Sequence, residues 1–106
     1  MRVTIDLDYD DPAYAKRLLE RLRQLFGNAY IRKTRRGYHL KSYTSLGFDE
    51  ALEVREMLGD DPVRVRLDRM RLKKPKQILW TWKEGFKNGP WRESLDEALS
   101  GEREVR

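Results

Sequence analysis

The order of two hydrophobic periodicities most constrains what this chain can fold into. Residues 2–8 alternate strictly between apolar and polar side chains, which is typical of a strand with one buried face. Asp11 and Pro12 then form a helix start signal, and apolar residues recur at helical spacing until Gly27. The chain therefore begins with a strand that is followed by an amphipathic helix over residues 12–26.

A β-hairpin is predicted next. Residues 29–33 and 38–43 read as two short strands on either side of a turn over residues 34–37. We expect Gly37 to take a positive φ in this turn, since glycine adopts that conformation without a steric penalty. The hairpin would place its two strands antiparallel and side by side.

A second helix and a fourth strand complete the pattern. Residues 48–58 carry apolar side chains at helical spacing and stop at Gly59. Residues 63–68 return to strict alternation, which predicts a fourth strand. The resulting order β-α-β-β-α-β is typical of an α+β sandwich of the ferredoxin-like, or RRM-like, type.

The length of 106 residues fits one domain. Its core is expected over about residues 1–72, and a C-terminal extension with a short strand and a helix over about residues 73–106. Hydrophobic residues make up 39% of the chain and charged residues another 39%, which indicates a folded core under a densely charged surface rather than a disordered chain.

The C-terminal extension carries weaker signals. The basic stretch 71–76 interrupts the periodicity, and residues 78–82 are a candidate for an additional strand. Ser94, with Glu97 three residues later, fits a capping box for a short helix through Leu99, after which the chain reads as a charged tail.

Charge and cysteine content narrow the class of partner. Lys and Arg exceed Asp and Glu by 23 to 18, and the net charge of +5 favours polyanionic partners such as nucleic acids. The absence of cysteine excludes disulfides, thiolate chemistry and cysteine-ligated zinc. No signal-peptide or transmembrane pattern occurs, so we expect a cytoplasmic protein without a membrane partner.

Strand parity sorts the side chains of the expected sheet. In a sandwich of this kind the helices cover one face, so the alternating apolar residues should point toward them. The other face is expected to be open and polar. Its expected members are Thr4, Asp6, Asp8, Tyr30, Arg32, His39, Lys41, Arg64, Arg66 and Asp68.

Two interpretations of this polar face stay open. An uncovered sheet face is polar in any case, and opposite charges on neighbouring strands pair across it. Asp6 and Asp8, however, are like charges whose spacing projects both carboxylates the same way, which suits Mg²⁺ or Mn²⁺. The single histidine, His39, is expected beside them, where an imidazole can contact phosphate, and Asp68 would add a third carboxylate.

Three short motifs on this face resemble the catalytic core of the archaeo-eukaryotic primase superfamily. The motifs are Ile5-Asp6-Leu7-Asp8, Thr34-Arg35-Arg36-Gly37-Tyr38-His39 and Leu67-Asp68. The resemblance covers about residues 3–71 and implies an RRM-like unit of DNA replication, or of a viral or plasmid-type system. If such a unit is an enzyme, it is a metal-dependent nucleotidyltransferase, and a protein partner would complete the replication assembly.

The resemblance also implies roles for individual residues. Asp6, Asp8 and Asp68 would hold Mg²⁺ or Mn²⁺, and His39 would contact the phosphates of a nucleotide as the catalytic residue. Basic residues of the same region are expected to contact nucleic acid or phosphate. They are Arg32, Arg35, Arg36, Lys41, Arg64, Arg66 and Arg71.

Two further classes of function remain. A binding module without chemistry would stack bases on aromatic side chains above a basic surface. The candidate rings are Tyr30, Tyr43, Trp80, Trp82 and Trp91, although the tryptophans fit a core-capping role as well. An assembly protein that dimerises through its sheet would need no ligand, so both a monomer and a homodimer are considered.

Overall fold

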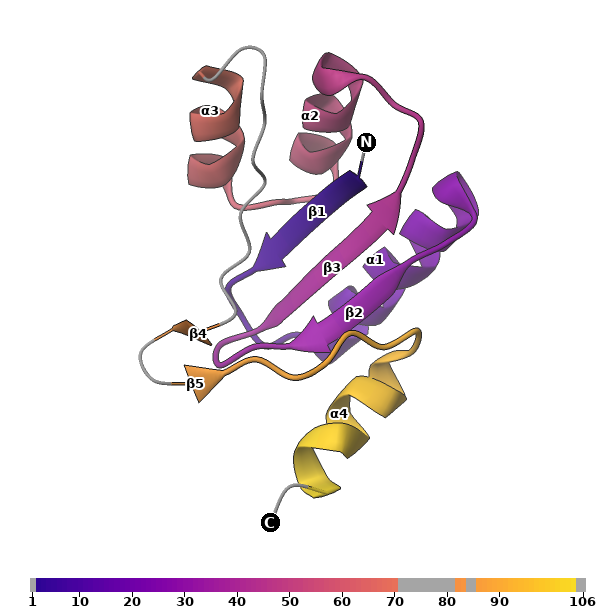
Figure 1. Cartoon of the computed structure of the whole chain (residues 1–106), viewed down its shortest axis with the longest axis vertical. Coiled ribbons are helices and arrows are strands. Elements are labelled where there is room, and N and C mark those ends of the chain that lie inside the picture. The colour runs from indigo at the N-terminus through magenta and orange to yellow at the C-terminus, as the bar shows by residue number, and fades with distance from the viewer. Residues whose placement is uncertain (1, 71–81, 84–85, 105–106) are drawn as a thin grey trace.

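Figure 1 shows a three-stranded antiparallel sheet with α1 behind it and the other helices around it. The structure, a computed structural model, describes residues 2–70, 82–83 and 86–104. None of its helices in these ranges is long and apolar enough to cross a membrane. The elements in chain order are β1 (Arg2–Leu7), α1 (Pro12–Phe26), β2 (Tyr30–Lys33), β3 (Tyr38–Tyr43), α2 (Phe48–Met57), α3 (Pro62–Met70), β4 (Trp82–Lys83), β5 (Phe86–Lys87) and α4 (Leu95–Glu104).

The ends of α1 form as the sequence predicts. The Asp11 carboxylate accepts a hydrogen bond of 3.1 Å from the backbone N–H of Tyr14, and Pro12 opens the helix. Gly27 ends it with φ 79°, and its N–H donates to the Arg23 carbonyl at 2.8 Å. The predicted class, α+β, is confirmed by this helix together with the sheet.

The sheet has the strand order β1-β3-β2. Both outer strands pair antiparallel with β3, so β1 and β2 run parallel to each other and α1 connects them past the central strand. Ile5 lies opposite Leu40, and Leu40 lies opposite Ile31, which places these three fully buried side chains on one face. That face is the apolar face that parity predicts.

The hydrophobic core lies between this apolar face and three helices. Helix α1 contributes most of the helical side chains, including Leu18, Leu19 and Leu22, which are nearly or fully buried. Ala51 brings α2 into the same cluster, and Leu95 brings α4. The helices therefore leave the opposite, polar face of the sheet to other parts of the chain.

The fourth strand predicted over residues 63–68 is wrong, because these residues belong to α3. Asp61 and Pro62 start the helix, and the Asp61 carboxylate accepts a hydrogen bond of 2.9 Å from the N–H of Val63. Val65 and Asp68, three residues apart, are the buried side chains of this helix. A short alternating segment fits both periods, and here packing against α2 selects the helical one.

The C-terminal segment runs along the outer edge of β2. Ile31 and Arg92 exchange two backbone hydrogen bonds of 2.7 Å, and the N–H of Gly89 donates to the Lys33 carbonyl at 3.1 Å. The edge of the sheet at β2 is thereby paired, which removes an exposed row of backbone groups.

Helix α4 begins with the predicted capping box. The Ser94 hydroxyl accepts a hydrogen bond of 3.1 Å from the Glu97 N–H and donates to the Glu97 carboxylate at 3.2 Å. The helix continues to Glu104, beyond the predicted end at Leu99. The strand expected over residues 78–82 lies outside the described residues except for Trp82, where β4 begins.

Gly37 has a different role from the predicted one. It is not among the glycines with positive φ, which are Gly27 and Gly59 in the described chain. A Cβ at Gly37 would instead clash with the Leu7 carbonyl oxygen and lie 2.6 Å from the Tyr9 carbonyl oxygen. Glycine is needed here because the hairpin tip packs directly against the backbone that follows β1.

We predict that Gly37→Ala lowers the free energy of unfolding by about 2–3 kcal/mol, because the new methyl group meets backbone that has no room to move. Gly47→Ala is the matched control, since the nearest atom to its Cβ is a Glu50 side-chain oxygen at 3.7 Å. It should cost less than about 1 kcal/mol. Urea unfolding measures both, and equal stability of the two variants would contradict the proposed backbone contact.

Candidate nucleic-acid interface

The strands carry on their polar face the side chains that parity predicts for them, whereas Arg64, Arg66 and Asp68, expected on the same face, lie on helix α3. Thr4 lies opposite Lys41, Asp6 opposite His39, and His39 opposite Arg32, so all five share one face. The expectation that this face is open is wrong for three of them. Thr4, Arg32 and His39 are only 0%, 8% and 5% exposed.

Trp91 lies on this face because of how the chain returns along β2. The paired hydrogen bonds between Ile31 and Arg92 set the register, and alternation then turns Trp91 toward the polar face, opposite Arg32. The guanidinium carbon of Arg32 is 4.5 Å from the centre of the Trp91 ring. The ring centres of Trp91 and His39 are 6.5 Å apart. Trp91 thus contributes to covering the two buried polar side chains.

Arg32, His39 and Asp6 form a polar chain across the three strands. Arg32 Nε–H donates to His39 Nδ1 at 3.0 Å, and His39 Nε2 lies 3.5 Å from Asp6 Oδ1. A guanidinium only donates hydrogen bonds, so Nδ1 accepts and Nε2 carries the ring proton toward Asp6. Burial lowers the pKa of Arg32, and the charge of Asp6 opposes that shift. The histidine is held in one orientation and is not presented to solvent.

The carboxyl group of Asp6 has a raised pKa. Burial is the largest cause and raises the pKa from the usual 3.8 to about 6, against the opposing charge of Arg64. The negative charges of Asp60, Asp8 and Asp61 add to the increase. Asp6 therefore takes up a proton in mildly acidic solution, where an exposed carboxyl group stays ionised.

A buried ion-pair network that the sequence did not predict joins β1, α2 and α3. Asp60, between the two helices, accepts hydrogen bonds of 2.8 Å from Arg55 Nε and from the backbone N–H of Asp6. The Arg64 guanidinium donates to the same carboxylate. Arg55 also donates through Nη1 to Asp68 at 2.7 Å. The network holds α3 beside the edge of β1.

The three carboxylates assigned to a metal ion are not brought together. Asp6 is in β1 and Asp8 lies just after the strand, but Asp8 is exposed and lies 3.7 Å from the Arg36 guanidinium. Asp68 belongs to α3, where Arg55 holds its buried carboxylate. Within the described ranges, no group of three or more Asp, Glu or His side chains is arranged to hold a metal ion. The donor set does not fit the metal site that the resemblance implies.

Lys41 lies among three aromatic rings on the polar face. Its Nζ is 4.3 Å from the ring centre of Trp91, 5.4 Å from that of Tyr43 and 5.9 Å from that of Tyr30. The two tyrosines meet edge to face with ring centres 6.1 Å apart. Tyr43 is 54% exposed, and Tyr30, Lys41 and Trp91 are half-buried. We call these four residues the aromatic platform.

Two predicted phosphate contacts lie at the tip of the β2–β3 hairpin. Arg35 and Arg36 are exposed in the turn, in which the Thr34 N–H donates to the Gly37 carbonyl at 3.0 Å. The Gly37 N–H returns a bond of 3.0 Å to the Thr34 hydroxyl. These two hydrogen bonds between Thr34 and Gly37 fix the turn, and both arginine side chains lie on the outside of the molecule.

The other predicted basic residues lie elsewhere. Arg64 points inward and donates to the Thr4 hydroxyl at 2.8 Å, so it belongs to the ion-pair network and not to an exposed surface. Arg66 is exposed on α3 beside a pocket between α2 and α3. Three candidates lie outside the described part of the chain: Arg71, Trp80 and the side chain of Trp82.

Comparisons of the chain with protein-family models, with curated proteins and with solved structures found no match. Its function is therefore inferred from the geometry and charge of its surfaces.

We predict that Asp6→Asn flattens the pH dependence of stability. The folded protein holds the Asp6 proton up to about pH 6, whereas the unfolded chain releases it near 3.8, so the free energy of unfolding falls as the pH rises between these values. Asn removes that loss and should raise stability above pH 7 by roughly 1 kcal/mol after allowance for partial exposure. Glu20→Gln, an exposed change on α1, is the control. Stability is measured by urea unfolding at a series of pH values. If the free energy of unfolding of Asp6→Asn and of the parent changed with pH in the same way, the raised pKa of Asp6 would be contradicted.

Proposed function

We propose that the domain binds single-stranded nucleic acid across the polar face of its sheet. The observation that supports this most directly is the aromatic platform, in which Lys41 Nζ lies 4.3–5.9 Å from three ring centres. Unpaired bases stack on exposed aromatic rings, and a neighbouring cation binds the phosphates between them. Double-stranded nucleic acid offers no free base faces to such a surface.

The rings are held by rigid elements. Tyr30 and Lys41 lie opposite each other on paired strands, and Tyr43 is two residues beyond Lys41 on the same strand. Trp91 is fixed by the backbone pairing of its neighbour Arg92 with Ile31. A surface that is ordered before the ligand arrives loses little conformational entropy on binding.

Charge at the far end of β3 extends the proposed site. The strand covers the six residues Tyr38–Tyr43 and is about 20 Å long, with the aromatic platform on its second half and the hairpin tip before its first residue. Arg35 and Arg36 are exposed at that tip. A single strand that lies along β3 would meet rings at one end and guanidinium groups at the other, and the net charge of +5 favours its approach.

We propose that the domain has a ferredoxin-like arrangement of its sheet and that it does not catalyse nucleotidyl transfer. The order β1-β3-β2 with α1 as the crossover is the order of the first three strands in a ferredoxin-like sheet. A relation to the primase-type core is retained at this level alone. Catalysis of that type needs grouped carboxylates, and Arg55 holds Asp68 on another element.

We predict that Tyr30→Ala with Tyr43→Ala weakens binding of a short fluorescein-labelled single-stranded DNA or RNA at least tenfold, because each lost stack is worth about 1–3 kcal/mol. The matched control is Tyr9→Ala, since Tyr9 is 51% exposed but lies after β1, outside the platform. Fluorescence anisotropy at constant salt measures the Kd. Equal losses in the two variants would contradict the platform, and unaltered binding of both nucleic acids would reject it altogether.

We also predict that Arg35→Gln with Arg36→Gln makes binding less sensitive to salt. Two lost phosphate contacts should reduce the slope of log K against log salt by about 1.4 for a single strand. Lys16→Gln with Arg21→Gln removes the same charge from the exposed side of α1 and serves as the control. If both double variants change the slope equally, Arg35 and Arg36 act only through the net charge of the protein, and the predicted phosphate contacts at the hairpin tip are contradicted.

A further inference from the structure

The outer side of α2 and α3 leaves several large apolar side chains exposed. Met57, Val63, Leu67 and Met70 are 81%, 50%, 49% and 71% exposed, and they are four of the seven such side chains in the described chain. On α3 the three residues Val63, Leu67 and Met70 follow the spacing i, i+4, i+7 and form one stripe. Contiguous exposed apolar side chains, unlike singly scattered ones, mark candidate interaction surfaces.

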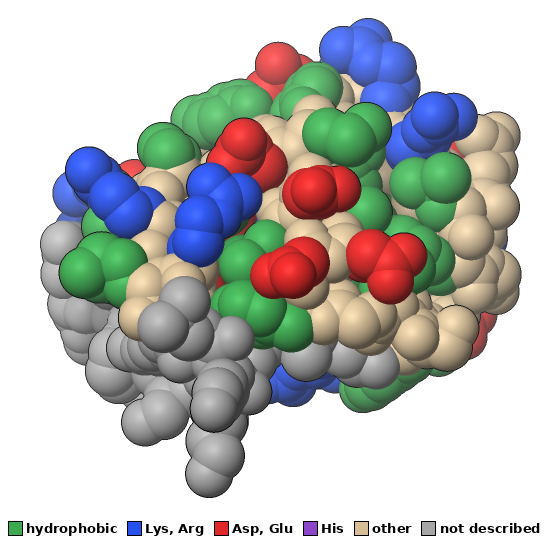
Figure 2. All heavy atoms as spheres, turned by 90° about the horizontal axis from the view of Figure 1, so that it is seen from above, with side chains coloured by type: hydrophobic (Ala, Val, Ile, Leu, Met, Phe, Trp, Pro, Cys, Tyr) green, Lys and Arg blue, Asp and Glu red, His purple; other side chains and the backbone are tan. Residues whose placement is uncertain are grey.

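The charges around these apolar residues differ in sign between the two helices. Helix α2 carries four exposed acidic side chains, whereas the exposed charges of α3 are the arginines Arg66 and Arg69. Figure 2 looks down on this end of the molecule and shows acidic side chains gathered together, with Lys or Arg side chains beside them. The acidic residues of α2 are Asp49, Glu50, Glu53 and Glu56.

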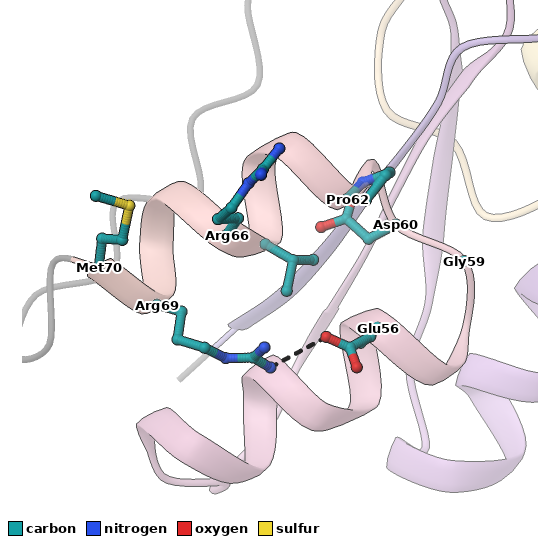
Figure 3. Close-up of a pocket in the computed structure, with 8 residues that line it drawn as sticks. Glu56, Gly59, Asp60, Pro62, Arg66, Arg69 and Met70 are labelled. Carbon is teal, nitrogen blue, oxygen red and sulfur yellow. Dashed lines mark hydrogen bonds and ion pairs between the residues drawn. The ribbon is translucent and has the colours of Figure 1, made fainter.

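The two helices are joined across a hollow. Arg69 reaches from α3 to Glu56 on α2, with a distance of 3.1 Å between Nη2 and Oε2, as the dashed line in Figure 3 marks. Beside this ion pair lies a pocket of about 530 Å³, lined in part by Pro62, Val65 and Met70. Its apolar lining gives a partner side chain a place to insert.

We infer that the face formed by α2 and α3 binds a second copy of this chain in a two-fold symmetric dimer. A two-fold axis at this face sets α2 of one copy against α3 of the other, so the contact between an acidic and a basic helix occurs twice in the dimer. The surface is complementary to itself because both signs of charge occur side by side on it. The exposed methionines and leucine would fill the centre, where interfaces favour apolar residues and methionine.

A partner of a single charge would be repelled by one of the two helices. An acidic ligand meets the acidic side chains of α2, and a basic ligand meets Arg66 and Arg69 on α3. Like charges that face each other across an interface oppose binding, which favours the second copy over either of these partners. The dimer does not depend on the proposed function, because it uses residues of α2 and α3 and none of the four residues of the aromatic platform.

The test uses charge reversal in the full chain, with analytical ultracentrifugation over a concentration series. Asp49→Lys with Glu50→Lys and Glu53→Lys leaves Glu56 as the single exposed acidic side chain of α2 and makes both helices basic, and Arg66→Glu with Arg69→Glu makes both helices acidic. Each variant alone should dissociate at least tenfold more readily than the parent, because like charges then face each other. Mixed in equal amounts, the two variants should form a heterodimer, since opposite charges again meet at both contacts. A misfolded variant could not restore association in this way.

Two more variants distinguish a dimer through α2 and α3 from a dimer through the sheet. Leu67→Asp should weaken the dimer, whereas Tyr30→Ala with Tyr43→Ala should leave it unchanged. A parent that is monomeric at concentrations up to about 1 mM would overturn the inference. So would a dimer that resists both charge reversals, a mixture that fails to associate, or a dimer that is lost only with the tyrosines, which would assign it to the sheet. Loss of nucleic-acid binding in the tyrosine variant would leave the dimer inference intact.

Discussion

The carboxylate of Asp60 is the interaction on which the arrangement of β1, α2 and α3 depends. Its oxygens accept from the β1 backbone at Asp6, from Arg55 on α2 and from Arg64 on α3. A buried charge is costly to desolvate, and a nearly complete set of partners is needed to offset that cost. Removal of one partner from such a network typically destabilises a protein by about 3–5 kcal/mol. The position of α3 therefore depends mainly on this network, since Val65 is its one buried apolar side chain and Leu67 lies in solvent.

The network also divides the polar face of the sheet into two halves. Near β1, Arg64 donates to Thr4 while its charge acts on Asp6, so these groups satisfy one another inside the protein. Near β2 and β3, Lys41 contacts rings instead of carboxylates, and the exposed ring of Tyr43 leaves room for a ligand. A cation among aromatic rings keeps its charge available for phosphate, whereas a cation in a buried ion pair does not. The second half is thus the better candidate for binding.

The sequence predicted the elements whose pattern is local, and it failed where distant residues decide. Strand β1, helix α1, the hairpin and α2 follow from periodicity and caps within each segment. Helix α3 does not, because alternation over residues 63–68 fits either period and the decision comes from Arg55, thirteen residues before Asp68. The sequence indicates Trp91 as a candidate ring for stacking. Its place opposite Arg32 follows from backbone pairing with β2, which no local pattern indicates.

The motif around Gly37 shows how one set of residues can fit two explanations. Gly37 is required by the close approach of backbone near Tyr9, and the Tyr38 hydroxyl donates to Asp10 at 2.7 Å. His39 Nδ1 accepts a hydrogen bond from Arg32, and the imidazole centre lies 6.5 Å from the ring centre of Trp91. Gly37, Tyr38 and His39 thus each have a structural reason inside the fold. A strand of nucleic acid on this face would meet Lys41 and the exposed rings before it reached the buried imidazole, which favours recognition by stacking and charge over chemistry at the histidine.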